Sequence, residues 1–185
     1  MSAIPYSVRG ERRSKSGGPV YSAYGFFDIP SSGVLMSNPN AVQYITELKV
    51  KDSTTPVGMS IASGVITINE PGTYSINGQF RPIGSLPDGT GFGQIGGFSG
   101  YLVDAQNPGT SLGVLAEFEI RSAPVFNPSF QPDISFLRGT FSGETILVTT
   151  VSNFQFKVGS TCFYKDGTIV RLAQGGTCLN VFKIV

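Results

Sequence analysis

The stretch that decides the fold runs from Gly64 to Phe80 and reads Gly-Val-Ile-Thr-Ile-Asn-Glu-Pro-Gly-Thr-Tyr-Ser-Ile-Asn-Gly-Gln-Phe. Apolar residues occupy every second position on both sides of a Pro-Gly pair: Ile66, Ile68, Tyr74, Ile76 and Phe80. Side chains alternate between the two faces of a strand, so this period of two predicts one core-facing side for each strand. Pro followed by Gly supplies a turn. The stretch therefore predicts strand, turn, strand, in the form of a hairpin.

The same pattern recurs along the whole chain. Further strands are expected over residues 19–28, 42–51, 98–104, 112–121, 134–141, 145–151, 154–164, 168–173 and 178–185. Turns are expected at residues 107–109, 142–143, 166–167 and 175–176, and loops over 82–100 and 123–132. A helix is conceivable over 42–51, which lacks Gly and Pro, but its β-branched content and period of two favour a strand.

The frequency of chain breakers sets the fold class. With 24 Gly and 12 Pro in 185 residues, long helices are excluded, and a parallel sheet would need crossover helices that the chain does not offer. About ten closely spaced strands predict an all-β fold, an antiparallel β-sandwich of the jelly-roll type. The last strand, Leu179 to Val185, is apolar on both faces and is expected at the centre of a sheet.

Composition indicates a protein that hides much of its surface against partners. The 185 residues predict a single domain over 19–185. Charged residues make up only 14%, against about 25% in typical soluble domains. The 14 Phe and 7 Tyr are many rings for one sandwich to bury alone. We therefore expect oligomerisation.

The first eighteen residues form a flexible basic arm, which ends in Ser-Lys-Ser-Gly-Gly. Its cations are Arg9, Arg12, Arg13 and Lys15. Either it is a solvated tail, or it contacts an anionic surface or a neighbouring subunit. In the second case, deleting residues 1–18 should weaken assembly and spare the fold.

Charge and targeting signals predict no membrane or nucleic-acid partner. The net charge of +1 gives no global signal for nucleic acid or membrane binding. No apolar run approaches the roughly 20 residues that span a bilayer, and the chain shows no secretory leader and no Asn-X-Ser/Thr acceptor. We expect a protein with no membrane span, made and kept outside the secretory route.

No catalytic motif emerges from the residues. The chain has no His, which removes Ser-His-acid and Cys-His catalysis and His-based metal sites. Glu117 and Glu119 stand at i and i+2 and are interpreted as solvated carboxylates on a strand edge. Gly91 to Gly96 matches Gly-X-Gly-X-X-Gly, but no strand is expected before it and no helix after it, as dinucleotide binding requires. We predict a non-enzyme without cofactor, metal or catalytic residues; a small carboxylate hydrolase is the weakest alternative.

The cysteines are expected to be free and buried. If residues 162–178 form a meander, Cys162 and Cys178 flank its middle strand about 10 Å apart, too far for a disulfide. A disulfide remains open if the two strands belong to different sheets.

The chain resembles the tumour-necrosis-factor/C1q-like jelly-roll superfamily. The resemblance covers residues 19–185 and rests on three segments: Ile66-Thr-Ile-Asn-Glu-Pro-Gly-Thr-Tyr74, the aromatic strand Tyr21 to Phe27, and the apolar strand Leu179 to Val185. The chain departs from the superfamily where Gly-Asp-X-Val usually opens a late strand; it has Ser152-Asn153-Phe-Gln-Phe there. The resemblance implies a jelly roll that assembles, as a homotrimer.

A jelly roll with few charges and a basic arm resembles capsid, cement and fibre proteins of virions. The leading hypothesis is a structural protein of a virus particle, located in the virion, with itself and other capsid proteins as partners. The alternative is a head domain that binds a host receptor or glycan through loop residues. The candidate loop contacts are Phe92, Gln94, Phe126 and Phe130.

Overall fold

The computed structural model describes residues 21–38, 41–85, 88, 95–119, 140–164 and 168–184. These residues form three antiparallel sheets. Sheet A has the order β11 (Phe141–Thr149), β7 (Gly72–Phe80), β14 (Cys178–Lys183), β1 (Tyr24–Asp28) and β4 (Lys49–Val50). Sheet C has the order β10 (Ser111–Glu119), β9 (Ile95–Asp104), β12 (Phe154–Tyr164), β6 (Val65–Ile68) and β5 (Met59–Ala62), and β3 (Gln43–Tyr44) also pairs with β12. Sheet B has the order β2 (Val34–Met36), β13 (Ile169–Leu172) and β8 (Pro82–Ser85).

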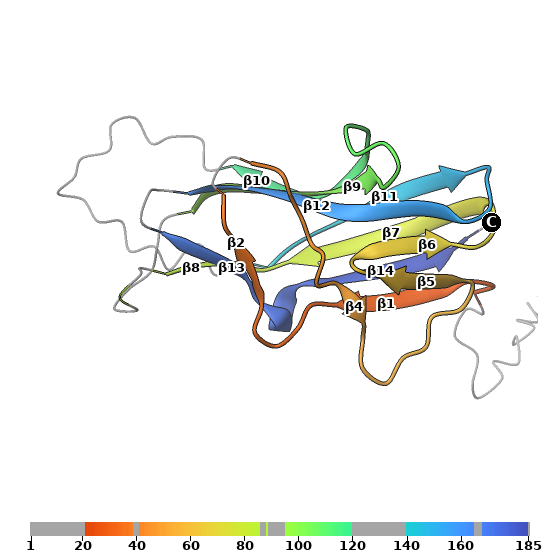
Figure 1. Ribbon diagram of the computed structural model, residues 1–185, viewed down its shortest axis with the longest axis horizontal. Coiled ribbons are helices and arrows are strands. Elements are labelled where there is room, and N and C mark those ends of the chain that lie inside the picture. The colour runs from red at the N-terminus through yellow and green to blue at the C-terminus, as the bar shows by residue number, and fades with distance from the viewer. Residues whose placement is uncertain are drawn as a thin grey trace, which may run out of the picture.

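Sheets A and C form the two layers of a sandwich, and sheet B lies at the end of the molecule far from the C-terminus (Figure 1). The largest fully buried side chains come from both layers: Phe27, Tyr74, Phe80, Phe98 and Phe156. The predicted all-β jelly-roll sandwich is therefore confirmed. No helix in the described part of the chain is long and apolar enough to cross a bilayer.

The deciding stretch is strand, turn, strand as predicted, but it is not a hairpin. β6 pairs with β5 and β12 in sheet C, whereas β7 pairs with β11 and β14 in sheet A. The chain crosses from one layer to the other at residues 69–71, where the Tyr74 hydroxyl donates to the Glu70 carbonyl at 2.8 Å. A paired hairpin would put both apolar faces on one side of one sheet. The crossing lets Ile66 and Ile76 enter the same core from opposite layers.

The last strand lies where it was expected. β14 is the middle strand of sheet A, between β7 and β1. Leu179 and Val181 are buried, and Phe182 is half-buried on the opposite face. The expected turns at 107–109 and 175–176 are also present. In the first, the Thr110 N–H donates to the Asn107 carbonyl at 2.8 Å. The second is a 3-10 turn, Gln174–Gly176.

Three expected elements are wrong. The loop expected over 82–100 contains β8 at its start and the first residues of β9, from Ile95, at its end. Residues 42–51 form two short strands, β3 and β4, which pair in different sheets. Ile45 and Leu48, three residues apart, are both buried, and this spacing cannot be met by one strand with a period of two. Ser142 and Gly143 are not a turn, because they continue β11 opposite Gln79 and Gly78. Residues 134–139 of the strand expected over 134–141, the whole loop over 123–132 and the turn at 166–167 lie outside the described residues.

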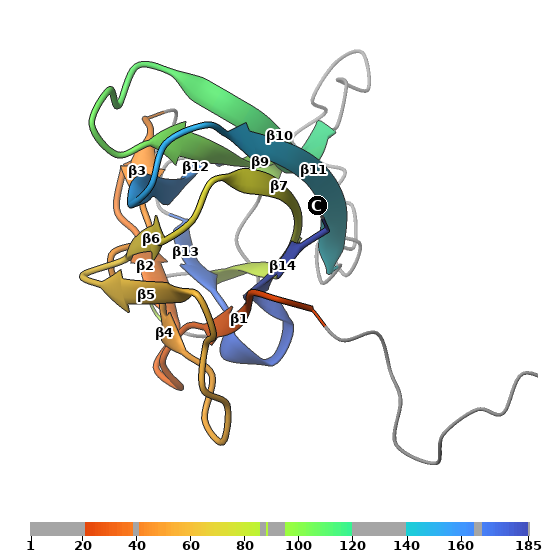
Figure 2. The same cartoon turned by 90° about the vertical axis from the view of Figure 1, so that its right-hand side faces the viewer.

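Gly143 is needed for close approach where the two layers meet. β10 of sheet C lies beside β11 of sheet A, which brings the sandwich edges together (Figure 2). A Cβ added at Gly143 would stand 2.1 Å from the Leu115 carbonyl oxygen. No side chain fits there unless the two backbones separate.

We expect Gly143→Ala to lower the free energy of unfolding by about 1–3 kcal/mol, the usual cost of overpacking. Gly109→Ala is the matched control, because a Cβ at Gly109 meets nothing within 4 Å; its effect should stay below about 0.5 kcal/mol. Urea unfolding measures both. Equal stability of the two variants would contradict the close approach of β10 and β11.

Candidate interaction surface

The outer face of sheet A is formed by the residues that the core does not use. In β7, Tyr74, Ile76 and Phe80 are buried in the sandwich. The intervening Ser75 and Asn77 therefore point to the other side of the sheet. Strand register places the outward residues of β11, β7, β14 and β1 in three rows: Ile146, Ser75, Phe182 and Tyr24; Glu144, Asn77, Asn180 and Phe26; Ser142, Gln79, Cys178 and Asp28.

One end of this face carries an apolar patch. Its members are Tyr21, Tyr24, Phe26, Ile146, Val148, Phe182 and Ile184. The Phe182 ring lies 4.7 Å from the Tyr21 ring and 5.5 Å from the Phe26 ring, measured between centroids. Ile146 is 50% and Val148 66% exposed. Val148 lies opposite Thr73 on β7, and the Ile184 N–H donates to the Thr73 carbonyl at 2.8 Å, so the patch continues past the first row, away from the polar end of the face.

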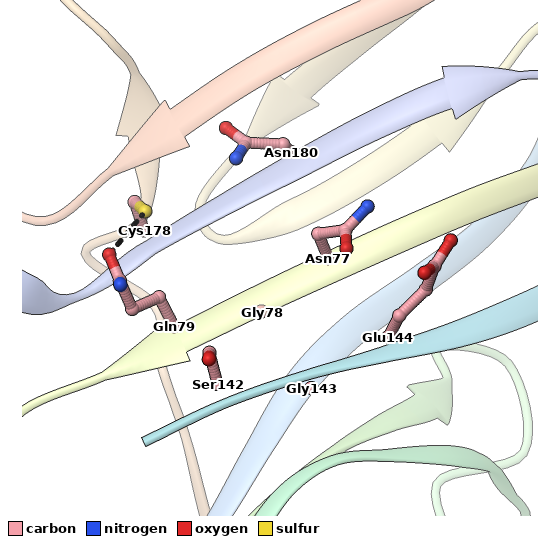
Figure 3. Close-up of a pocket in the computed structure, with 8 residues that line it drawn as sticks. All are labelled: Asn77, Gly78, Gln79, Ser142, Gly143, Glu144, Cys178 and Asn180. Carbon is pink, nitrogen blue, oxygen red and sulfur yellow. Dashed lines mark hydrogen bonds between the residues drawn. The ribbon is translucent and has the colours of Figure 1, made fainter. Parts of the chain in front are cut away.

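The other end of the face holds a polar pocket of about 300 Å³. Its lining comes from three neighbouring strands: Asn77, Gly78, Gln79, Ser142, Gly143, Glu144, Cys178 and Asn180 (Figure 3). The buried Ser75 hydroxyl donates to Glu144 Oε1 and accepts from Asn77 Nδ2 at 3.1 Å. The Cys178 thiol contacts Gln79 Oε1 at 3.6 Å. The pocket therefore offers one carboxylate among several amides.

The polar half of the face carries charges of both signs. Glu144 is exposed and makes no ion pair with any cation of the described ranges. Asp28, in the last row beside Cys178, lies opposite Lys49 of β4, and its Oδ1 is enclosed by the protein without a hydrogen bond from the described residues. Of these two carboxylates, Glu144 is therefore the one that can accept hydrogen bonds from a partner.

The two cysteines are free, as predicted, but for a different reason. β12 and β14 belong to different sheets, so the expected meander over 162–178 is wrong. Cys162 is buried in the core, whereas Cys178 is half-buried on the outer face of sheet A, so the two thiols lie on opposite sides of sheet A. Desolvation raises the pKa of Cys162 to about 12. Desolvation also raises the pKa of Cys178, and the charge of Lys51 opposes that shift.

Most of the residues singled out in the sequence lie outside the part of the chain that the structure describes. The arm cations Arg9, Arg12, Arg13 and Lys15 and the loop residues Phe92, Gln94, Phe126 and Phe130 lie outside the described residues. Glu117 is exposed on β10, the edge strand of sheet C, in agreement with a solvated carboxylate. β9 begins at Ile95, so a strand stands where the dinucleotide motif needs a helix.

Sequence patterns alone missed the polar pocket. Its side chains occupy the alternate positions of β7 and β14, which a period of two assigns to solvent. A usable signal was the amide content of those positions: Asn77, Gln79 and Asn180. Nowhere in the described ranges do three Cys, Asp or Glu side chains gather as a metal site requires. What the pocket offers chemically is hydrogen-bond recognition of a cationic group.

Comparison with solved structures identifies the fold. Eiger TNF from S. frugiperda superposes with a TM-score of 0.55 at 12% identity, covering 90% of this chain and 94% of that one. Two structures of murine APRIL each superpose with a TM-score of 0.52. The structure at pH 8.0 is 8% identical and covers 88% of this chain and 98% of that one. The structure at pH 5.0 is 10% identical and covers 88% of this chain and 99% of that one. No protein-family model and no curated protein matches the chain. The chain thus has a TNF-like jelly-roll fold, which confirms that part of the resemblance.

Proposed function

We propose that this chain is a non-enzymatic structural protein of a virus particle, which packs as a homotrimer through the outer face of sheet A. The observation that carries the proposal is the apolar patch on that face. The trimeric state comes from the resemblance to TNF/C1q-like jelly rolls, and the virion role from the resemblance to capsid, cement and fibre proteins. The TNF-like fold is compatible with this assembly, and the low share of charged residues, 14%, supports a surface covered by partners.

The face is large enough for a stable interface. Five strands about 4.8 Å apart, with β7 extending over nine residues, span roughly 20 by 30 Å. A standard protein interface buries about 800 Å² on each partner, which is of the same order. The charged side chains in the three rows are Glu144 and Asp28, and Lys49 of β4 continues the row of Asp28; all three lie outside the apolar patch. An apolar region free of charge is typical of the centre of an interface.

The patch gathers side chains that elsewhere are scattered. Ile146, Val148 and Ile184 adjoin the four half-buried rings of the patch, whereas Val114, exposed on sheet C, lies opposite one half-buried ring, that of Tyr101. Each Å² of apolar surface removed from water contributes about 25 cal/mol before the costs of association. Burial of this patch between copies therefore makes the main favourable contribution to the free energy of association. The head-domain alternative rests on loop residues outside the described ranges, so no described contact favours it.

We expect Ile146→Asp and Val148→Asp to dissociate the trimer, because each places a carboxylate at the centre of the interface. Val114→Asp is the matched control: Val114 is 51% exposed, close to the 50% of Ile146, but lies on sheet C. Light scattering coupled to gel filtration measures the mass, and circular dichroism verifies that all variants fold. A folded Ile146→Asp variant with the mass of the wild type would contradict the use of this face.

The virion role is tested separately by a mass-spectrometric inventory of particles purified from the culture that produces this chain. We expect the chain at a fixed ratio to the major capsid protein, retained after high-salt washing. Its absence from washed particles would overturn the virion assignment and leave the assembly through sheet A untouched.

A further inference from the structure

We propose that the polar pocket of each subunit binds the arginine-rich segment Arg9–Lys15 of a neighbouring copy. This inference rests on the proposed assembly through sheet A and names the site at which the arm connects subunits. The occupant is chosen from the chain itself, because the chain carries a cluster of cations shortly before the described residues and a pocket with the carboxylate of Glu144 on the face where those residues begin.

Charge and hydrogen-bonding capacity favour a guanidinium group. Glu144 Oε1 already accepts from Ser75, and the side chain has no described cationic partner to neutralise it. The side-chain carbonyl of Asn77 lies on β7, the next strand of the sheet, and that of Asn180 lies on β14, one strand further. A guanidinium presents five N–H donors in a plane and pairs with carboxylates through two parallel hydrogen bonds. One arginine can thus engage Glu144 and the neighbouring amides together.

The arm presents several cations to this one carboxylate, at positions 9, 12, 13 and 15. Asp28 is not part of the site, because its Oδ1 is enclosed by the protein and Lys49 lies opposite it on β4.

The arm starts close enough to reach. The described chain begins at Tyr21, whose ring packs on Phe182 in the apolar patch. Glu144 lies three strands across the sheet and about five residues along it, which is roughly 20 Å from that point. At about 3.3 Å per extended residue, the arm cations lie between roughly 20 and 40 Å along the chain from Tyr21.

The same starting point favours the pocket of a neighbour over the arm's own. Tyr21 belongs to the apolar patch, which the proposed assembly covers. An arm that returned to its own pocket would have to lie across this patch and compete with the neighbouring subunit. An arm that continues outward enters the interface and meets the neighbour's face instead.

The native thiol of the pocket makes the proposal testable by cross-linking. Ser14 stands between Arg13 and Lys15, so Ser14→Cys places a thiol in the arm without removing a cation. The chain Ser14→Cys/Cys178→Ser, carrying a tag, is mixed with untagged full-length wild-type chain and oxidised with copper phenanthroline. We expect a tagged-to-untagged disulfide on non-reducing gels, formed between the thiol introduced into the arm and Cys178 of the wild-type chain. Cys162 is buried and does not compete.

Two further chains distinguish specific docking from random collision. An untagged partner carrying Glu144→Lys should lose the cross-link by at least tenfold, since the charge is reversed while Cys178 remains. A partner carrying Glu117→Lys, on sheet C, receives the same charge change away from the pocket and should cross-link normally. Equal cross-linking of both partners, or none with wild type, would overturn the proposal.

The outcomes separate this proposal from the one on which it rests. The chain Ser14→Cys alone reports where its own arm goes: an intrachain disulfide, seen as a monomer with two hydrogens less in mass, would overturn the assignment to a neighbour. Light scattering of the same sample reports assembly. A trimer without the cross-link refutes the arm site alone, whereas a monomer refutes the assembly through sheet A.

Discussion

The structure depends on one constraint: the chain must deliver apolar side chains from two layers into a single core, and it does so by crossing between them at residues 69–71. Ile66 and Ile68 enter from sheet C, and Tyr74 and Ile76 enter from sheet A. The Tyr74 ring is buried while its hydroxyl is satisfied by the Glu70 carbonyl, so the aromatic residue after Pro-Gly both fills the core and holds the crossing. Core-facing alternation then fixes which residues remain outside.

The residues left outside on sheet A are not those of an ordinary solvated surface. The outer rows pass from aromatic and branched side chains at one end to amides and carboxylates at the other. An apolar region gains free energy when it leaves water, and a carboxylate without a partner gains when it meets a cation. The two halves of the face therefore favour different contacts. The apolar half favours contact with a second sandwich, and the polar half favours contact with a basic segment.

Local alternation predicted the sandwich, because burial on every second residue is a property of each strand alone. The apolar residues on both faces of the last strand predicted the central position of β14. Which strands pair with one another is not a property of a single strand. The hairpin and the meander over 162–178 were wrong because pairing in a jelly roll joins strands distant in sequence, such as β1 with β14. Gly143 was taken for a turn residue, although its role is the close approach of Leu115 across the layers. The pocket escaped prediction because Glu144 and Asn77 come together only through the register of β11 and β7.

The most direct test of the account is hydroxyl-radical footprinting of the native full-length protein, read by mass spectrometry at Tyr24, Phe26 and Phe182 of the apolar patch. Phe163, which is 48% exposed on sheet C, is the internal reference for a ring left in water. The account predicts that the three rings of the patch are oxidised far more slowly than in the isolated subunit, while Phe163 reacts freely. Oxidation of Tyr24, Phe26 and Phe182 at the rates of a solitary sandwich would contradict it.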